Sequence, residues 1–143
     1  MNSKYEINTK ENQEFLKASC EDLLNFGHRF PSPNGGSYYL GDDGTPWKDR
    51  NRETWITCRM AHVYSLGLML CHEGSGELVD AALKGLKGEL HDEKNGGWYA
   101  GVTQEGGIVP NKQCYAHAFV ILAASSALTA GRPGAKELLE EAL

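Results

Sequence analysis

The stretch from Glu53 to Leu70 limits the fold of this chain more than any other. Apolar residues occur nearly all the way round the helix that this stretch predicts, so the helix has no continuous polar face. A helix of that kind is normally buried in a protein interior. We therefore expect a helical protein in which this segment lies at the centre.

Three side chains stand out on one side of this helix. Trp55, Arg59 and His62 are separated by four and then three residues, so they share a face. An arginine keeps its charge, and a buried guanidinium without a partner would cost about 3–5 kcal/mol. Arg59 therefore extends to the surface, pairs with a structural carboxylate, or faces a polar cavity where a ligand oxygen is its partner. The helix alone leaves these alternatives open.

The remaining sequence predicts helices arranged in pairs. A second stretch that is apolar almost all round, residues 113–130, resembles the central one, and each is followed by an amphipathic stretch. Glycine pairs flank Trp98–Val102 between the two helix pairs and predict a β-hairpin. A further helix precedes these, opened by a capping box of Asn8 and Glu11. The expected helices span residues 9–28, 53–70, 76–90 (capped by Ser75), 113–130 and 134–143.

The two helix pairs share a pattern. Ala61-His62 and Ala116-His117 have similar places in the two buried helices, and GELVDAAL resembles AKELLEEAL in the two outer helices. Repeated helical hairpins are typical of an array or a closed toroid of helix pairs. We therefore predict an all-α fold of helical-hairpin repeats with a short β-hairpin between them.

The segment ahead of the central helix has the composition of loops and turns. Ser37–Leu40, followed by the turn sequence GDDG, predicts a short extended piece. Trp47 in this loop is expected to cover an edge of the core rather than to contact a ligand. The helix before the loop has one apolar side, which includes Phe15, Leu16, Leu23 and Phe26.

Size and charge exclude several functions. A chain of 143 residues has the size of one domain, and its net charge of −5 argues against nucleic acid as a partner. Its apolar runs are too short to cross a bilayer, and the polar N-terminus argues against a signal peptide. We therefore expect a cytoplasmic protein whose cysteines are reduced thiols. These cysteines are Cys20, Cys58, Cys71 and Cys114.

The final helix stops at Leu143 with its apolar stripe unfinished and without a C-terminal cap. An array of helical hairpins leaves its last pair half covered unless something caps it. We therefore expect residues 1–143 to form a single domain that is the front part of a longer protein. A homo-oligomer, in which a second copy covers the open end, is the alternative.

Three other kinds of chemistry have weak support: zinc binding, a cysteine nucleophile and glycoside hydrolysis. Cys58 with His62 and Cys114 with His117 could bind zinc if their helices met, although this spacing matches no known zinc motif. As a catalytic nucleophile, Cys114 would have a possible base in the nearby His117, whereas the adjacent Tyr115 points away from it on the helix. A glycosidase would need two facing carboxylates. The loop carboxylates that could serve, which we expect to be solvated, are Asp42, Asp43, Asp92 and Glu93.

A carbohydrate site explains the polar and aromatic residues better. In a toroid of helix pairs, the starts of the inner helices and the loops before them line one mouth. Arg59, Trp55, Tyr115, Trp98 and Tyr99 would then converge there. Fixed hydrogen-bond donors beside flat aromatic faces are the features with which proteins bind sugars.

Three motifs carry a family resemblance. TWITCRMAHVYSLG, GGWYAGV and NKQCYAHAFVILAASSALTAGRPGA closely resemble the N-acylglucosamine 2-epimerase superfamily, and within it the bacterial aldose–ketose isomerases acting on mannose or sulfoquinovose. SYYLGDDG is similar to the extended loop before the first inner helix of those enzymes. The resemblance covers most of the chain from Phe15 onward and implies the N-terminal part of an (α/α)6 barrel.

The resemblance also implies an activity and a set of substrate-binding residues. The family transfers a proton beside a sugar carbonyl through an ene-diol, without a metal or organic cofactor. Arg59 matches an arginine that contacts the sugar oxygens and stabilises the oxyanion, Tyr115 a substrate-binding tyrosine, and Trp55 a tryptophan of the pocket wall. Trp98 lies in the matching hairpin. The family's catalytic histidines lie on later inner helices, and neither His62 nor His117 matches them.

Three functions follow from these observations. The first is a sugar isomerase or epimerase with a monosaccharide substrate, of which this chain is an N-terminal part that is inactive alone. The second is a non-catalytic helical-repeat module that binds a carbohydrate or another protein. The third is a glycoside hydrolase on the same (α/α)6 framework, which would require an acidic pair.

Overall fold

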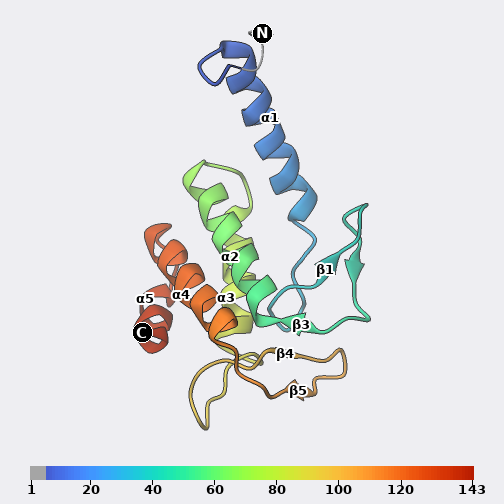
Figure 1. The fold of residues 1–143 in the computed structure, drawn as a ribbon, viewed down its shortest axis with the longest axis vertical. Coiled ribbons are helices and arrows are strands. Elements are labelled where there is room, and N and C mark those ends of the chain that lie inside the picture. The colour runs from blue at the N-terminus through green and yellow to red at the C-terminus, as the bar shows by residue number, and fades with distance from the viewer. Residues whose placement is uncertain (1–5) are drawn as a thin grey trace.

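A computed structural model describes residues 6–143 as a mostly helical protein with two small sheets (Figure 1). All the expected helices are present, and most are shorter at their ends than the sequence suggested. None of the helices in the described residues is long and apolar enough to cross a membrane. The helices are α1 (Lys10–Gly27), α2 (Thr54–Met69), α3 (Ser75–Leu86), α4 (Cys114–Thr129) and α5 (Ala135–Ala142); the strands are β1 (Tyr39–Leu40), β2 (Pro46–Trp47), β3 (Arg52–Glu53), β4 (Gly101–Val102) and β5 (Ile108–Val109).

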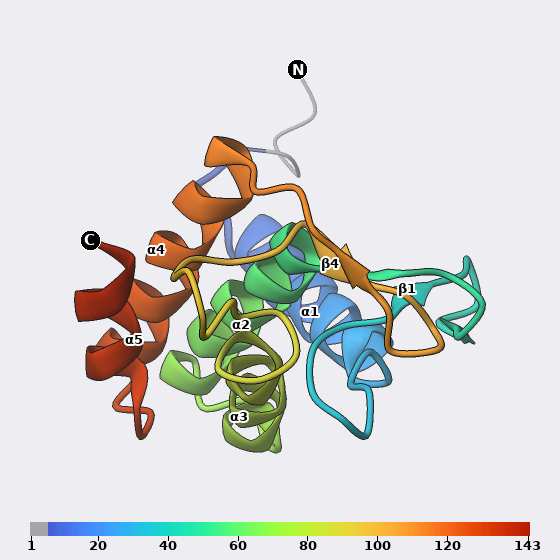
Figure 2. The ribbon, with the colours of Figure 1, turned by 90° about the horizontal axis from the view of Figure 1, so that it is seen from below.

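The inner helices α2 and α4 lie side by side and form the centre of the molecule (Figures 1 and 2). The helix α3 packs against α2, and α5 packs against α4. The two helical hairpins therefore have the order that the sequence predicted, an inner helix followed by an outer one. The helix α1 leads away from the bundle and makes few contacts with α2.

The turns within the two hairpins have the same geometry sixty residues apart. Cys71 and Gly131 are both left-handed, with φ of 62° and 72°. Gly74 and Gly134, which precede the outer helices, are left-handed as well. Left-handed φ is accessible to glycine without the steric cost that other residues pay. The turns thus confirm the internal repeat and fix its register.

This register corrects one prediction of the sequence. With a spacing of sixty residues, Tyr115 corresponds to Trp55, and His62 corresponds to Leu122. The equivalence of Ala61-His62 with Ala116-His117 is therefore wrong by five residues. A dipeptide could not set the register because both inner helices are apolar almost all round, whereas the turn geometry sets it unambiguously.

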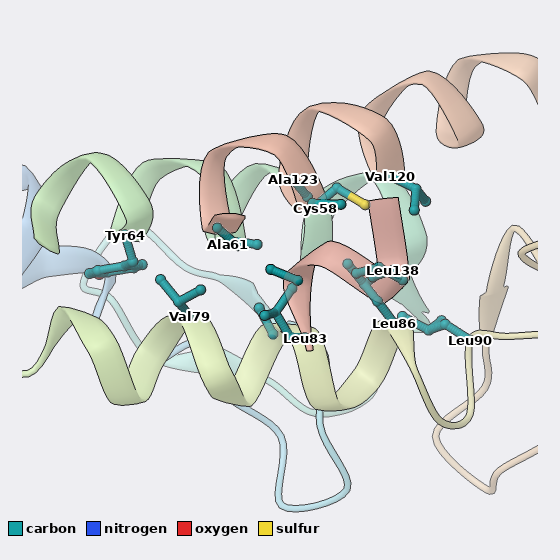
Figure 3. Close-up of a cluster of buried hydrophobic side chains, with 14 of the residues drawn as sticks. Cys58, Ala61, Tyr64, Val79, Leu83, Leu86, Leu90, Val120, Ala123 and Leu138 are labelled. Atoms are coloured by element: carbon teal, nitrogen blue, oxygen red, sulfur yellow. The ribbon is translucent and has the colours of Figure 1, made fainter. Parts of the chain in front are cut away.

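The core lies between the two hairpins (Figure 3). Small side chains of the inner helices, among them Ala61 and Ala123, allow α2 and α4 to approach each other closely. The outer helices bury the stripes that their spacing predicted. The buried outer residues include Val79, Leu83, Leu86 and Leu138.

The inner helices are only partly buried, contrary to expectation. Val63 and Leu66 on α2 and Leu122 on α4 are exposed, because the two hairpins cover only one side of these helices. The apolar side of α1 is exposed for the same reason, and Leu23 on it has 70% of its surface accessible. The apolar patterns are present as predicted, but within residues 6–143 these side chains keep a large part of their surface accessible.

Two helix starts also differ from prediction. The side chain of Thr9, not that of Asn8, accepts a hydrogen bond from the Asn12 amide at 3.3 Å and caps α1. Ser75 is the first residue of α3, and the capping position belongs to Gly74. In both places the cap lies one residue from the expected position, within the usual uncertainty of helix boundaries.

A small antiparallel sheet joins the starts of the two inner helices. The predicted hairpin is present as β4 and β5, beginning at Gly101 rather than at Trp98. The strand β3 adds to it and pairs Glu53 with Gly101. A side chain at Gly101 would lie 2.6 Å from the Arg52 carbonyl oxygen, so only glycine fits there. The sheet therefore fixes the segment before α2 against the hairpin that leads into α4.

The start of α2 is also anchored to the turn after α3 and to the loop after α1. The buried guanidinium of Arg52 donates hydrogen bonds to the Ser32 hydroxyl at 2.8 Å and to the Gly35 carbonyl at 3.1 Å. The same group forms an ion pair with Glu89 at 2.5 Å. These contacts hold the backbone beside Glu53 in place.

The turn at Gly131 generates a stability prediction. A Cβ at this position would meet nothing within 4 Å, so a substitution there changes only the backbone energetics. We expect Gly131→Ala to lower the free energy of unfolding by about 1–2 kcal/mol, the cost of left-handed φ for a residue with a Cβ. Gly131→Asn should cost less, since asparagine adopts this conformation more readily. Urea denaturation measures both, and equal stability of the alanine variant and the parent would contradict the prediction.

Candidate functional site

The most distinctive polar contact in the molecule joins the two inner helices. The Arg59 guanidinium on α2 donates a hydrogen bond from Nη2 to the Tyr115 hydroxyl at the start of α4, at 3.0 Å. Both side chains are exposed, and 54% of the Tyr115 surface is accessible. In the described residues no carboxylate lies within ion-pair distance of Arg59. Of the three alternatives for Arg59, a structural carboxylate partner is therefore not found within residues 6–143.

Aromatic rings surround the Arg59 guanidinium. Its Cζ atom lies 4.8 Å from the centre of the Trp55 ring and 5.0 Å from that of Phe119. Tyr115 in turn contacts Trp55, with ring centres 6.1 Å apart, and Phe119, at 4.9 Å. Ring faces attract a cation without using its N–H donors. Arg59, Trp55 and Tyr115 thus lie together, as the sequence predicted.

A carboxylate that the sequence did not identify holds the Trp55 ring. The Glu53 Oε2 atom accepts a hydrogen bond from the Trp55 indole nitrogen at 2.6 Å and another from the Tyr39 hydroxyl at 2.5 Å. Burial, reinforced by this hydrogen bond to Glu53, raises the pKa of Tyr39 to about 12. Tyr39 therefore remains a protonated donor at neutral pH. We call Tyr39, Glu53, Trp55, Arg59 and Tyr115 the Arg59 cluster.

Trp47 lies at the edge of this cluster and not at the edge of the core. It remains 41% exposed, so the expected role as a core cover is wrong. The Arg50 guanidinium lies over its ring at 4.6 Å and over the Tyr39 ring at 5.5 Å. Pairing of β1 with β2 places Trp47 opposite Tyr39, which explains why both rings share one cation.

Trp98 lies apart from the Arg59 cluster. Only 3% of its surface is accessible, and its indole nitrogen donates to the Leu86 carbonyl at 2.7 Å. Its ring packs between His91 and His117, each with ring centres 5.3 Å away. The structure thus makes Trp98 part of the core beneath the hairpin. Tyr99 is turned toward Lys112, whose Nζ atom lies 5.8 Å from the Tyr99 ring centre.

The two inner-helix histidines have separate partners. The His62 ring hydrogen-bonds the Ser126 hydroxyl at 2.7 Å, and His117 Nε2 hydrogen-bonds the Ala142 carbonyl at 2.8 Å. These contacts join neighbouring helices within the bundle. Neither ring hydrogen-bonds to Arg59 or Tyr115.

The cysteines and histidines considered for zinc do not assemble. Cys58 is fully buried in the core, where burial raises the pKa of its thiol, whereas Cys114 is exposed. Nowhere in residues 6–143 do three or more histidine, cysteine or acidic side chains form a group that could hold a metal ion. Cys58 therefore acts as a small core residue.

The loop carboxylates have structural partners of their own. Asp43 accepts hydrogen bonds from the Thr45 amide at 2.9 Å and hydroxyl at 2.8 Å, and these hydrogen bonds lower its pKa. Asp92 is almost buried, so the expectation that it is solvated is wrong. Lys112, 2.7 Å away, and hydrogen bonds from Asn95 hold the Asp92 pKa well below its usual value. Both carboxylates thus stabilise turns.

The two helical hairpins define a helical-repeat protein in which an arginine, a tyrosine and a tryptophan gather at the starts of the inner helices. The chain belongs to the N-acylglucosamine 2-epimerase (GlcNAc 2-epimerase) family, which it matches over residues 35–143. This confirms the resemblance that its motifs indicated.

Two curated relatives show how much of a family member the chain represents. It is 39% identical over 129 residues to a D-mannose isomerase of Thermobifida fusca, covering 90% of this chain and 32% of the relative. It is 34% identical over 137 residues to a D-mannose isomerase of Pseudomonas cannabina pv. alisalensis, covering 96% of this chain and 33% of that relative. The chain therefore spans about a third of the length of these relatives.

Solved structures agree with the fold. A crystal structure of a D-mannose isomerase superposes with a TM-score of 0.80 at 23% identity, covering 91% of this chain and 35% of the other. Cellobiose 2-epimerase from Bacillus thermoamylovorans B4167 superposes with a TM-score of 0.75 at 24% identity, covering 91% of this chain and 36% of the epimerase. At these identities the similarity concerns the fold alone.

The cysteines generate a second prediction. Cys20, Cys71 and Cys114 are exposed, whereas Cys58 is buried and its thiol has a raised pKa. A thiol reagent such as DTNB should therefore modify three cysteines of the native protein rapidly and the fourth only on unfolding. A denatured sample provides the control for four reactive thiols. Rapid modification of all four in the native state would contradict the packing of Cys58.

Proposed function

We propose that this chain forms part of the sugar-binding wall of an aldose–ketose isomerase or 2-epimerase that acts on a mannose-like sugar. In this proposal its helical hairpins are the N-terminal part of an (α/α)6 barrel. The observation that carries the proposal is the hydrogen bond between Arg59 and Tyr115, flanked by Trp55 on the open face of the inner helices. The D-mannose isomerases among its relatives support the choice of substrate class.

The chemistry of the Arg59 cluster suits a sugar. A guanidinium has five N–H donors, and the contact with Tyr115 uses only one of them. The others can donate to adjacent hydroxyl groups of a monosaccharide. A fixed positive charge beside the sugar carbonyl would also stabilise the oxyanion of an ene-diolate as it forms. The exposed part of the Trp55 ring offers an apolar surface for the C–H face of a sugar.

The proton transfer itself requires a general acid and base near the sugar carbon. His62 and His117 hydrogen-bond to Ser126 and to the Ala142 carbonyl, so neither ring is directed at the Arg59 cluster. We propose that the catalytic histidines belong to later inner helices, following the family pattern. In this scheme Arg59 and Tyr115 bind and orient the sugar.

Activity of the isolated chain is the first test of this proposal. We expect the 143-residue polypeptide to show no detectable interconversion of mannose and fructose, because none of the histidines in the described residues hydrogen-bonds to the Arg59 cluster. A full-length D-mannose isomerase assayed in parallel provides the positive control. Interconversion that disappears in an Arg59→Ala variant would contradict the expectation and would make His62 or His117 the candidate base.

Sugar binding is the second test. D-mannose should bind the chain weakly, as measured by saturation-transfer difference NMR, and Arg59→Ala should weaken binding about tenfold or more, the value of charge-assisted hydrogen bonds. Arg29→Ala, which removes an exposed arginine elsewhere, is the matched control. Equal binding by the Arg59→Ala variant and the parent would refute the sugar site and favour a protein-binding module.

A further inference from the structure

We propose that Glu53 is a positioning residue of the sugar site: its carboxylate fixes the Trp55 ring, and through that ring it orients the Arg59 guanidinium for a ligand oxygen. This inference rests on the proposed function. It extends that function, because Glu53 is assigned a role that requires no contact with the sugar.

The carboxylate of Glu53 joins two aromatic side chains from different segments. Its Oε2 atom accepts both the Trp55 indole N–H at 2.6 Å and the Tyr39 hydroxyl at 2.5 Å. The two rings meet edge to face, with centres 6.4 Å apart. Charge-assisted hydrogen bonds of this length are stronger than neutral ones. Glu53 therefore holds the edge of the indole ring in one orientation.

The orientation of Trp55 decides where the Arg59 charge lies. A cation is attracted to the face of an aromatic ring and not to its edge. The Arg59 Cζ atom is 4.8 Å from the Trp55 ring centre, and the same guanidinium reaches the Tyr115 hydroxyl. Rotation of the indole would remove this face from under the cation. The arginine would then keep only the Phe119 ring and the Tyr115 hydroxyl as contacts and would be held less firmly.

Glu53 achieves this without an ion pair to Arg59. Among residues 6–143, neither Arg59 nor Arg50 comes within ion-pair distance of the Glu53 carboxylate. A direct ion pair would occupy the guanidinium donors that a sugar needs. The Trp55 indole lies between the Glu53 carboxylate and the Arg59 guanidinium. It fixes the arginine, and the carboxylate does not occupy the guanidinium N–H donors.

The backbone at Glu53 is held independently of its side chain. The strand β3 pairs with β4 at this residue, and the Glu53 carbonyl accepts a hydrogen bond from the Thr57 hydroxyl at 3.0 Å. The neighbouring Arg52 is anchored by its own partners. We therefore expect substitutions that change only the Glu53 carboxyl group to leave the fold intact.

Two conservative variants distinguish the effect of the position of the Glu53 carboxyl oxygen from the effect of its charge. Glu53→Gln keeps an acceptor oxygen at the same distance from the backbone and removes the charge, whereas Glu53→Asp keeps the charge and withdraws the oxygen by one methylene. D-mannose titration should give an affinity within about threefold of the parent for Glu53→Gln and a loss of about fivefold or more for Glu53→Asp. Glu105→Ala, on the exposed hairpin turn, is the control.

Two spectroscopic measurements report on the contacts themselves. The Trp55 indole N–H resonance should shift in Glu53→Asp, while that of the buried Trp98 stays in place as an internal control. In Glu53→Gln the pKa of Tyr39 should fall below about 12, because the carboxylate charge that raises it is gone while burial persists. Tyrosine ¹³C NMR across alkaline pH measures this change.

The outcomes distinguish this inference from the proposed function. Mannose binding that depends on Arg59 but is unchanged in Glu53→Asp would overturn the role of Glu53 and leave the sugar site intact. Preserved binding in Glu53→Asp with loss in Glu53→Gln would overturn it too, since charge alone would then matter. If both variants weaken binding, a shifted Trp55 indole resonance in both supports the inference, and an unshifted one overturns it. Binding that is insensitive to Arg59 refutes the sugar site itself.

Discussion

The close packing of α2 against α4 is the constraint on which the rest of the structure depends. Alanines at the interface, such as Ala61 and Ala123, let the two helices approach, and the sheet of β3, β4 and β5 holds their first turns together. Arg59 and Tyr115 lie 56 residues apart in the chain, and only this packing brings them within hydrogen-bond distance. The core and the candidate site are thus products of the same contact.

The features predicted from the sequence were those with a local periodic signal. The outer-helix stripes, including Val79 and Leu138, follow from spacing alone, and the structure buries them. The register of the repeat was not predictable from the inner helices, because an almost wholly apolar helix carries little phase information. The left-handed turns at Cys71 and Gly131 carry that information. A left-handed φ could not be predicted at Cys71, however, because cysteine rarely adopts this conformation.

The site was predictable in part for the same reason. Trp55 and Arg59 share a helical face and could be associated by spacing, and Tyr115 could be associated with them because it opens the second inner helix. Glu53 and Tyr39 could not be associated in this way, since a side-chain hydrogen bond between strands of two different sheets makes their contact, and no local spacing predicts it. Trp98 was misplaced because a hairpin tryptophan can point toward the mouth or the core, and the Leu86 carbonyl accepts its N–H in the core.

The arrangement around Arg59 shows how a protein can keep an arginine ordered and still chemically available. A carboxylate partner would fix the guanidinium most strongly, but it would also neutralise the charge and occupy its donors. Ring faces and one tyrosine hydroxyl fix it more weakly and leave most of its donors free of protein acceptors in the described structure. The acidic group, Glu53, contacts the Trp55 ring instead of Arg59. It therefore stabilises the ring on which the cation lies and does not pair with the cation itself. In the function proposed above, this division of roles keeps the arginine available to sugar oxygens.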